Sequence, residues 1–154
     1  MEVLVNVLEL QNYLYEKMPQ VKSMEVTVES ISPERLTVSA PLEPNINHRD
    51  SVFGGSASSI AILAAWAFLH QKLVSEGIST TLVIQKNTMS YDVPITGEFL
   101  ATAHLNNEAD WDKFISLLKR RGKSRINVSS LLEYAGQEAG KFEGTFVAVG
   151  CEAR

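Results

Sequence analysis

The sequence predicts an α+β fold in which one long helix packs on an antiparallel sheet. One observation is a run without a charged residue from Ser51 to Gln71, which is apolar or small nearly all round and therefore suits a buried helix. The other is a series of segments on both sides of this run in which apolar and polar residues alternate, as they do in strands. Prolines and glycines separate several of these segments, as expected for turns.

Composition limits the classes of function. The 154 residues suggest a single domain over residues 1–154, and the net charge of −4 argues against general nucleic-acid binding. The single cysteine, Cys151, fits a reducing cytosol, and the N-terminus lacks the pattern of a signal peptide. His48, His70 and His104 are scattered, and no cluster has zinc-ligand spacing. We therefore expect a cytoplasmic protein without a metal, an organic cofactor or a membrane partner.

The central helix is expected from about Phe53 to about Val74, with Glu76 and Gly77 closing it. Its length would also span a bilayer. Four serines, two glycines and His70 favour the buried helix of a soluble protein instead.

Before this helix, the chain predicts one amphipathic helix and one hairpin. The helix spans residues 2–18 and is stopped by Pro19. Its apolar stripe consists of Val3, Val7, Leu10, Leu14 and Met18. The hairpin strands are expected at residues 24–29 and 35–40, around a turn at residues 32–34.

After the central helix, we expect four strands and one short helix. The strands are predicted at residues 80–91, 99–105, about 124–134 and about 141–151, and the helix at residues 109–121. Gly122 is expected to cap the short helix. Gly136 and Gly140 are expected to form the last turn, and His104 to be an ordinary sheet residue sharing a face with Thr102.

Residues 45–73, NINHRDSVFGGSASSIAILAAWAFLHQKL, resemble the thioesterase-like family found as the C-terminal domain of YiiD-type proteins. The resemblance covers nearly the whole chain and implies a hotdog fold, in which the sheet wraps the long helix. In YiiD-type proteins an acetyltransferase domain precedes this one, and we do not expect that activity here. Free-standing members resemble malonyl-acyl-carrier-protein (malonyl-ACP) decarboxylases.

Common hotdog thioesterases carry a catalytic Asp or Glu on the central helix. In one large group it lies seven residues after the second glycine of the pair, which is Ile62 here. No carboxylate occurs from Ser56 to Ala65, and the serines of this run are expected to serve close packing. Ordinary hydrolysis is therefore disfavoured. Decarboxylation of a malonyl thioester needs no base, only hydrogen-bond donors for the oxygen that becomes an enolate.

The resemblance favours Asn45 as the catalytic residue, acting as a neutral amide donor in a proline-stiffened loop that we expect outside the core. The expected substrate-binding residues are Asn47, His48, Phe53, Gly54 and Gly55. Asparagines before helices also form turns and caps, and Asn47 competes with Asn45 for the role. His48 equally suits a loop network.

Five of the 14 basic residues fall within seven positions. They are Lys119, Arg120, Arg121, Lys123 and Arg125, called the basic run below. One interpretation is a solvated face at the C-terminus of a helix, which favours cations. The other is a docking surface for acyl carrier protein (ACP) or for the phosphates of coenzyme A.

The sequence thus predicts a malonyl-ACP decarboxylase that produces acetyl-ACP to prime fatty-acid synthesis. Two alternatives remain: an acyl-CoA or acyl-ACP thioesterase with an atypical base, and a non-catalytic acyl-thioester-binding protein. We expect a homodimer or a dimer of dimers, because the resemblance implies sites that form between two subunits whose sheets join edge to edge. The β-branched strand at residues 80–91 suits such an edge.

Overall fold

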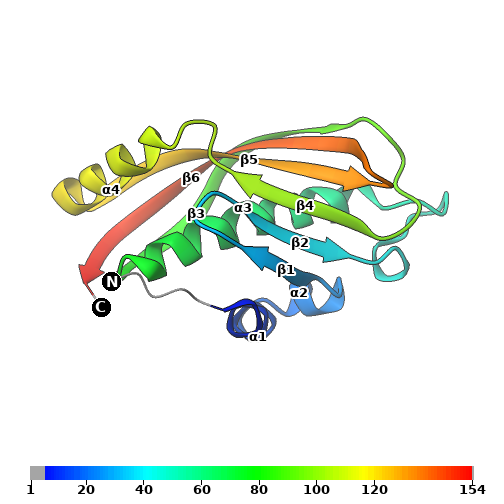
Figure 1. The fold of residues 1–154 in the computed structure, drawn as a ribbon, viewed down its shortest axis with the longest axis horizontal. Coiled ribbons are helices and arrows are strands. Elements are labelled where there is room, and N and C mark those ends of the chain that lie inside the picture. The colour runs from blue at the N-terminus through cyan, green and yellow to red at the C-terminus, as the bar shows by residue number, and fades with distance from the viewer. Residues whose placement is uncertain (1–5, 154) are drawn as a thin grey trace.

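The structure is a computed structural model and describes residues 6–153. One long helix, α3 (Gly54–Ser75), lies against one face of a six-stranded antiparallel sheet (Figure 1). The strands are β1 (Thr27–Ile31), β2 (Leu36–Ala40), β3 (Ile78–Tyr91), β4 (Phe99–His104), β5 (Lys123–Tyr134) and β6 (Gln137–Ala153). They are arranged in the order β1-β2-β4-β5-β6-β3. The predicted hotdog architecture is confirmed.

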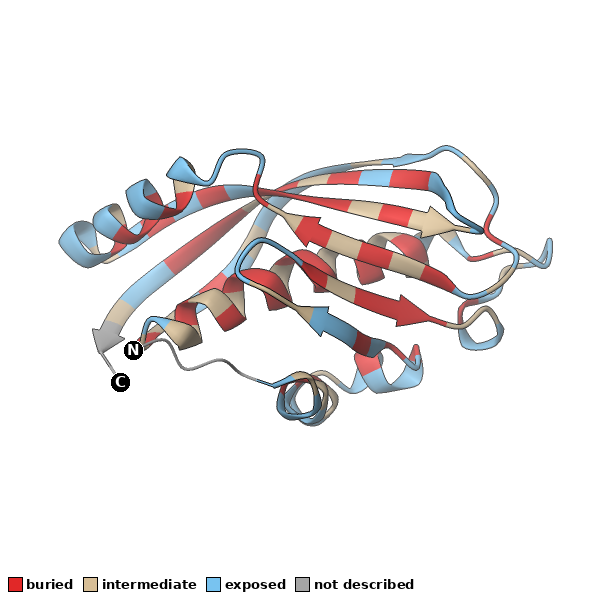
Figure 2. Cartoon of the chain, in the orientation of Figure 1, coloured by how far each residue is buried: buried red, intermediate tan, exposed pale blue. Residues whose placement is uncertain are grey.

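Helix α3 forms the centre of the core, as predicted (Figure 2). It is long and apolar enough to cross a membrane, with a mean hydropathy of 1.3, but 61% of that window is buried in the fold. One stripe of α3 is nevertheless only half-buried. This stripe consists of Ser59, Ile62, Trp66 and His70. The His70 ring stacks between Trp66 and Tyr13, with centroid distances of 4.7 and 4.8 Å.

The N-terminal segment forms two helices, α1 (Val7–Lys17) and α2 (Pro19–Ser23). Leu10 and Leu14 are buried, as the predicted stripe requires, whereas Val3 lies outside the described residues. Pro19 does end α1, but it also begins α2, since proline suits the first helical position. The expected strand start at Met24 is therefore wrong, because Met24 ends α2.

Helix α1 also covers the β1 edge of the sheet. The Gln11 side chain donates from Nε2 to the Val26 carbonyl at 2.7 Å and accepts from the Val28 amide at 2.6 Å. It thereby supplies β1 with contacts that a neighbouring strand would otherwise make. The opposite edge strand, β3, pairs only with β6, so its other side is an open edge among residues 6–153.

Helix α4 (Ala109–Arg121) ends at Gly122, whose φ of +72° is the left-handed cap that the sequence predicted. The Trp111 indole donates to Glu76 Oε2 at 2.6 Å and ties α4 to the C-terminal end of α3. The turn between β5 and β6 is formed by Ala135 and Gly136, both with positive φ. The prediction that Gly140 belongs to this turn is wrong. Gly140 lies within β6, where a Cβ would come 2.7 Å from the Ser90 carbonyl oxygen.

Candidate functional site

The start of α3 is held by main-chain hydrogen bonds from the loop that precedes it. The Phe53 amide donates to the Asn45 carbonyl, and the Val52 amide donates to the Ile95 carbonyl, both at 2.8 Å. No side chain of residues 6–153 caps the helix. Within the described part of the chain, the amides of Gly54 and Gly55 have no hydrogen-bond partner. These N–H groups and the helix dipole favour an oxygen with negative charge.

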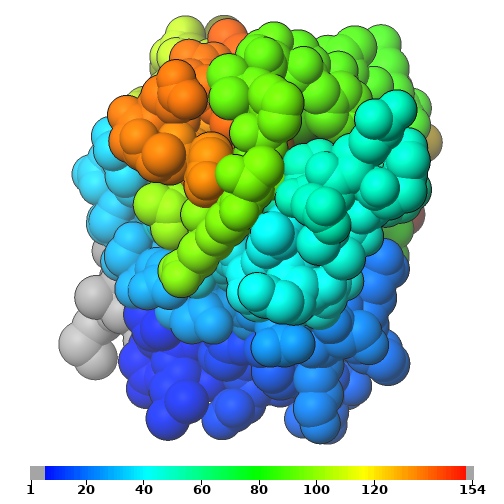
Figure 3. Space-filling model, turned by 90° about the vertical axis from the view of Figure 1, so that its right-hand side faces the viewer, coloured from blue at the N-terminus to red at the C-terminus, as the bar shows by residue number. Residues whose placement is uncertain are grey.

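A hollow of about 270 Å³ lies beside this helix start. It is lined by Ser51, Val52, Gly54, Ala57, Tyr91, Asp92, Val93, Pro94, Ile95, Leu132 and Ala139. Figure 3 shows this end of the molecule, where the loop before α3 lies beside the segment that follows β3. Most of the lining is apolar. The hollow therefore combines free helix amides with a weakly solvating wall.

Tyr91 and Asp92 are lining residues that sequence reasoning missed. The Tyr91 ring lies close enough to Gly54 that a Cβ there would be 3.5 Å from Cε1. Asp92 is the only carboxylate in the lining, and its Oδ2 accepts a hydrogen bond from Ser90 at 3.4 Å. The sequence around these two residues carries no motif that would have identified them. They reach the helix start only because β3 pairs with β6.

Asn45 lies at the end of the short 3-10 helix η1 (Glu43–Asn45) and is only 1% exposed, so the expectation that it lies outside the core was wrong. Its Nδ2 donates to the carbonyls of Met24 at 3.0 Å and Pro41 at 2.9 Å. Both amide hydrogens are therefore engaged, and Oδ1 is buried without a partner among residues 6–153. In this arrangement Asn45 holds the loop and has no amide hydrogen left for a substrate.

Asn47 forms a turn, which was the alternative interpretation. Its Oδ1 accepts from the amides of Arg49 at 2.8 Å and Ser51 at 3.2 Å, and its Nδ2 donates to Ser51 Oγ at 3.0 Å. His48 is exposed in the same turn. The structure does not bring Asn47 or His48 into the lining of the hollow.

Phe53 and Gly55 lie at the rim of the helix start. Phe53 is 57% exposed, and its ring lies over Gly55, where an added Cβ would overlap it. Of the predicted substrate-binding residues, Gly54 lines the hollow itself, and Phe53 and Gly55 are its immediate neighbours in the chain.

A second cavity, of about 470 Å³, runs along the half-buried stripe of α3. It is lined by Lys17, Met18, Pro19, Gln20, Val21, Met24, Ser59, Ile62, Leu63, Trp66, Ile84 and Phe146. Ile84 belongs to β3, so this mostly apolar cavity adjoins the open edge of the sheet. It has the character of a site for an apolar chain or for an apolar surface of another protein.

The basic run is far from the hollow of its own chain. All five residues are exposed, at the end of α4 and the start of β5. Lys123 pairs with Val149, which is level with Thr81 near the start of β3, whereas Gly54 lies beside Tyr91 at the end of β3. The two ends of the 22-residue helix α3 are about 33 Å apart at 1.5 Å per residue. The run and the hollow therefore occupy opposite ends of the molecule (Figure 1).

Nearly the whole described chain matches one known protein family. Residues 7–150 match the family described as "Putative thioesterase (yiiD_Cterm)". The chain belongs to this family. Its fold is similar to that of a protein of unknown function from Chlorobaculum tepidum, with a TM-score of 0.89, 27% identity and 94% of each chain covered.

Two further structures share the fold of this thioesterase-like chain. A putative thioesterase from Shewanella oneidensis has a TM-score of 0.83 and 24% identity, covering 93% of this chain and 96% of its own. A probable thioesterase from Pseudomonas aeruginosa has a TM-score of 0.83 and 16% identity, covering 97% and 99%. Both likenesses concern the fold, and the family membership rests on the match over residues 7–150.

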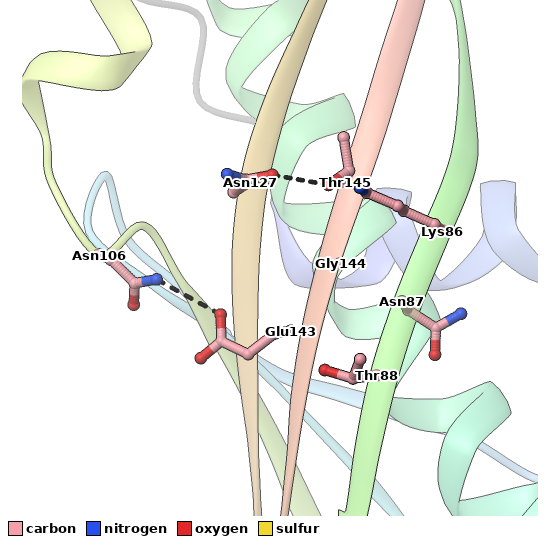
Figure 4. A pocket seen from close by; sticks show the side chains of 8 residues that line it. All are labelled: Lys86, Asn87, Thr88, Asn106, Asn127, Glu143, Gly144 and Thr145. Carbon is pink, nitrogen blue, oxygen red and sulfur yellow. Dashed lines mark hydrogen bonds between the residues drawn. The ribbon is translucent and has the colours of Figure 1, made fainter.

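This thioesterase-like chain also has a polar pocket of about 350 Å³ on the sheet face that points away from α3 (Figure 4). Glu143 Oε2 accepts hydrogen bonds there from Ser129 Oγ at 2.7 Å and Asn106 Nδ2 at 3.4 Å, and Thr145 donates to Asn127 at 2.7 Å. The polar side chains of this pocket therefore mainly form hydrogen bonds with one another. No group of three or more His, Cys, Asp or Glu residues suited to a metal occurs in the part of the chain that the structure describes.

Proposed function

We propose that this chain binds acyl thioesters at the N-terminus of α3 and decarboxylates malonyl-ACP to acetyl-ACP. The observation that carries the proposal is an uncapped helix start beside a hollow, on a helix that has no carboxylate from Gly54 to Ser75. Such a site can stabilise an oxyanion, but its helix offers no general base for water.

In the proposed reaction, the thioester carbonyl oxygen accepts hydrogen bonds from the free amides of Gly54 and Gly55. The bond between the α-carbon and the carboxylate breaks and releases carbon dioxide, and its electron pair forms the thioester enolate. The α-carbon then takes a proton from water, which completes the acetyl group. Each preorganised donor to such an oxyanion typically lowers the barrier by about 3 kcal/mol.

The surroundings support the departure of the carboxylate. Val52, Ile95 and Leu132 form an apolar wall, and a charged carboxylate is less well solvated there than in water. Asn45 acts in this proposal as a positioning residue, because its side chain holds the loop and its carbonyl fixes the Phe53 amide before the helix start.

Asp92 favours a second candidate, the hydrolysis of acyl thioesters. Its carboxylate lines the same hollow and is suited in type to act as a general base for water. The apolar cavity along α3 would suit an acyl chain longer than malonyl.

Incubation of the protein with malonyl-ACP separates these functions. Decarboxylation yields acetyl-ACP, hydrolysis yields free ACP thiol with malonate, and a binding protein leaves the substrate unchanged. The proposal predicts acetyl-ACP, and release of free thiol as the main product would overturn it.

Asp92→Asn sharpens the distinction, because it removes the carboxylate at nearly constant shape. We expect acetyl-ACP formation to stay within about threefold of wild type, since no proton is abstracted. If Asp92 is instead the general base, thiol release should fall about 10²–10⁴-fold. The two products are measured separately in the same reaction.

We further propose that the protein acts in the cytoplasm, on thioesters of ACP or coenzyme A, and as a dimer or a dimer of dimers. The open edge of β3 supports a dimer, and the basic run supports an anionic carrier.

A further inference from the structure

We propose that the exposed aromatic rings of Phe53 and Tyr91 shield the free amides at the start of α3 from water, one ring for each amide. This inference rests on the proposed function and deepens it, because it names two residues that strengthen the hydrogen bonds to the oxyanion. Both residues act through the amides of Gly54 and Gly55, and neither has to donate a hydrogen bond itself.

Two large aromatic side chains are left exposed at the helix start. Phe53 is 57% exposed and Tyr91 is 58% exposed. Rings with so much of their surface in water add little to the stability of the core. Apolar surface gathered around a few free polar groups is instead typical of a ligand-binding site. The polar groups here are the two amides that the fold leaves without a hydrogen-bond partner in the described part of the chain.

The Phe53 ring packs directly on Gly55. A Cβ added at Gly55 would overlap Cε2 of this ring and would lie 3.0 Å from its Cδ2. Glycine is therefore the residue that lets the ring approach the backbone so closely. The Cβ and the amide nitrogen of a residue are bonded to the same α-carbon, so a ring that fills the Cβ position also lies beside the amide.

The Tyr91 ring has the corresponding place at Gly54. A Cβ added at Gly54 would lie 3.5 Å from Cε1 and 3.8 Å from Cζ of Tyr91, which reaches this position from the end of β3. Side chains of successive residues point about 100° apart around a helix axis. The two rings therefore lie on different sides of the helix start, each against its own glycine.

Shielding matters because these two amides are free to bind water. Water bound to an amide must leave before an oxyanion can accept a hydrogen bond from the same group. A site that excludes water also strengthens the bond to a developing negative charge, since the local dielectric is lower. Phe53 is not part of the lining of the hollow, so water in the hollow can still supply the proton that the α-carbon takes.

Amide hydrogen exchange tests the shielding independently of activity. NMR measures the exchange with water of the Gly54 and Gly55 amides in wild type, Phe53→Ala and Tyr91→Ala. We expect Phe53→Ala to speed the exchange of the Gly55 amide about fivefold or more, and to change that of Gly54 less than about twofold. Tyr91→Ala should do the reverse.

Each of these variants is the control for the amide of the other. If either variant leaves its own amide unchanged, the proposal is overturned. An equal rise at both amides in either variant would show a loosened helix start and would also overturn the assignment of one ring to each amide. Ile46→Ala removes a 44% exposed apolar side chain from the same loop and should change neither amide.

Kinetics test whether the shielding serves the reaction. Phe53→Ala and Tyr91→Ala should each lower kcat for acetyl-ACP formation about tenfold and change KM less than about twofold, because the amides bind the oxyanion most strongly in the transition state. Phe53→Tyr and Tyr91→Phe keep the rings and should restore most of the lost kcat. A Tyr91→Phe variant as slow as Tyr91→Ala would assign the effect to the hydroxyl and overturn the shielding role of this ring.

Gly55→Ala displaces the Phe53 ring by a second route. It keeps the amide, but its Cβ occupies the place of the ring, so kcat should fall as in Phe53→Ala. The double variant should be no slower than either single variant, because both remove the same shield. A double variant slowed by the product of the two effects would contradict this role of the ring, and thermal unfolding checks that all variants fold.

The two readouts separate this inference from the proposed function. A wild-type protein that forms no acetyl-ACP would reject the proposed function, whereas hydrogen exchange would still decide whether the rings shield the amides. Faster exchange in the variants with an unchanged kcat would overturn the inference that shielding serves the reaction.

Discussion

Asn45 donates both hydrogens of its amide to main-chain carbonyls, one at Met24 after α2 and one at Pro41 after β2. Its own carbonyl accepts from the Phe53 amide just before α3. Through its side chain and its carbonyl, this one residue thus joins three segments at the site. Its Oδ1 is buried and has no hydrogen-bond partner among residues 6–153.

Asn45→Ala should therefore lower both stability and activity. Removing the amide leaves two carbonyls without their donor, so we expect the free energy of unfolding to fall by about 2–4 kcal/mol. We also expect a fall in kcat, because the start of α3 loses its support. Urea unfolding and acetyl-ACP formation measure the two effects.

Asn47→Ala is the matched control, because Asn47 is half-exposed in a turn. It should cost less than about 1 kcal/mol. A variant Asn45→Ala that unfolds like wild type but loses kcat would contradict the positioning role and restore the direct-donor role.

The sequence identified Asn45 as a special residue but not its environment. The prolines around it suggest a stiff loop, whereas its burial depends on α2. The alternating pattern of residues 24–29 predicted a strand start at Met24 and gave no sign of this helix. Asp92 was missed for a related reason. Its place in the hollow depends on the pairing of β3 with β6 and on the Ala139 carbonyl that receives its amide, which are contacts distant in sequence.

At the scale of elements, strong local signals gave accurate bounds. Helix α3 begins at Gly54 and ends at Ser75, within one residue of the prediction, because a long uncharged run has few alternative structures. Helix α4 was equally clear, since its apolar spacing and Gly122 agree. The failure at Gly140 shows the limit: a glycine also occurs where two backbones approach closely within a sheet.

Reversal of Arg120 and Arg121 to Glu should raise the KM for malonyl-ACP about tenfold and leave kcat nearly unchanged. The reason is that both residues are exposed at the end of α4, far from the hollow of their own chain. The salt dependence of KM should also weaken, because two of the steering charges are lost.

The pair Lys22→Glu and Arg35→Glu is the control for net charge. Both residues are exposed and lie outside the basic run, and the change in charge is the same. An equal rise in KM in both double variants would reduce the effect to net charge and contradict specific docking.

At the scale of the whole molecule, the two surfaces that a monomer leaves incomplete adjoin one another. These are the open edge of β3 and the half-buried stripe of α3 that borders the apolar cavity. The fold class could be predicted from the sequence, because one buried helix among alternating strands is expected to pack on an antiparallel sheet. The separation of the basic run from the hollow could not be predicted in this way, because it depends on the order and register of the strands in the sheet.

Ile62→Lys should weaken the dimer. Ile62 lies in the half-buried stripe, so a lysine there can reach water in the monomer but would be buried against a second copy. Light scattering should show two or four times the 17.0 kDa of one chain for wild type and a shift toward monomer for the variant. Leu8→Lys, at a residue 67% exposed on α1, is the control. A wild-type protein that is active as a monomer would contradict the dimer.

The central claim is that the free amides at the start of α3 stabilise the enolate, and the pair Gly54→Pro and Gly54→Ala tests it most directly. Proline suits a first helical position, and the ψ of 132° at Phe53 suits a residue before proline. Alanine keeps the amide and adds a Cβ at an ordinary 3.5 Å from the Tyr91 ring, so it controls for added bulk.

The measurement is kcat for acetyl-ACP formation by the two variants, with thermal unfolding as a check on folding. We expect Gly54→Pro to lower kcat about 10²-fold, since it removes one oxyanion donor, and Gly54→Ala to stay within about threefold of wild type. A folded Gly54→Pro protein with the same kcat as Gly54→Ala would contradict the claim.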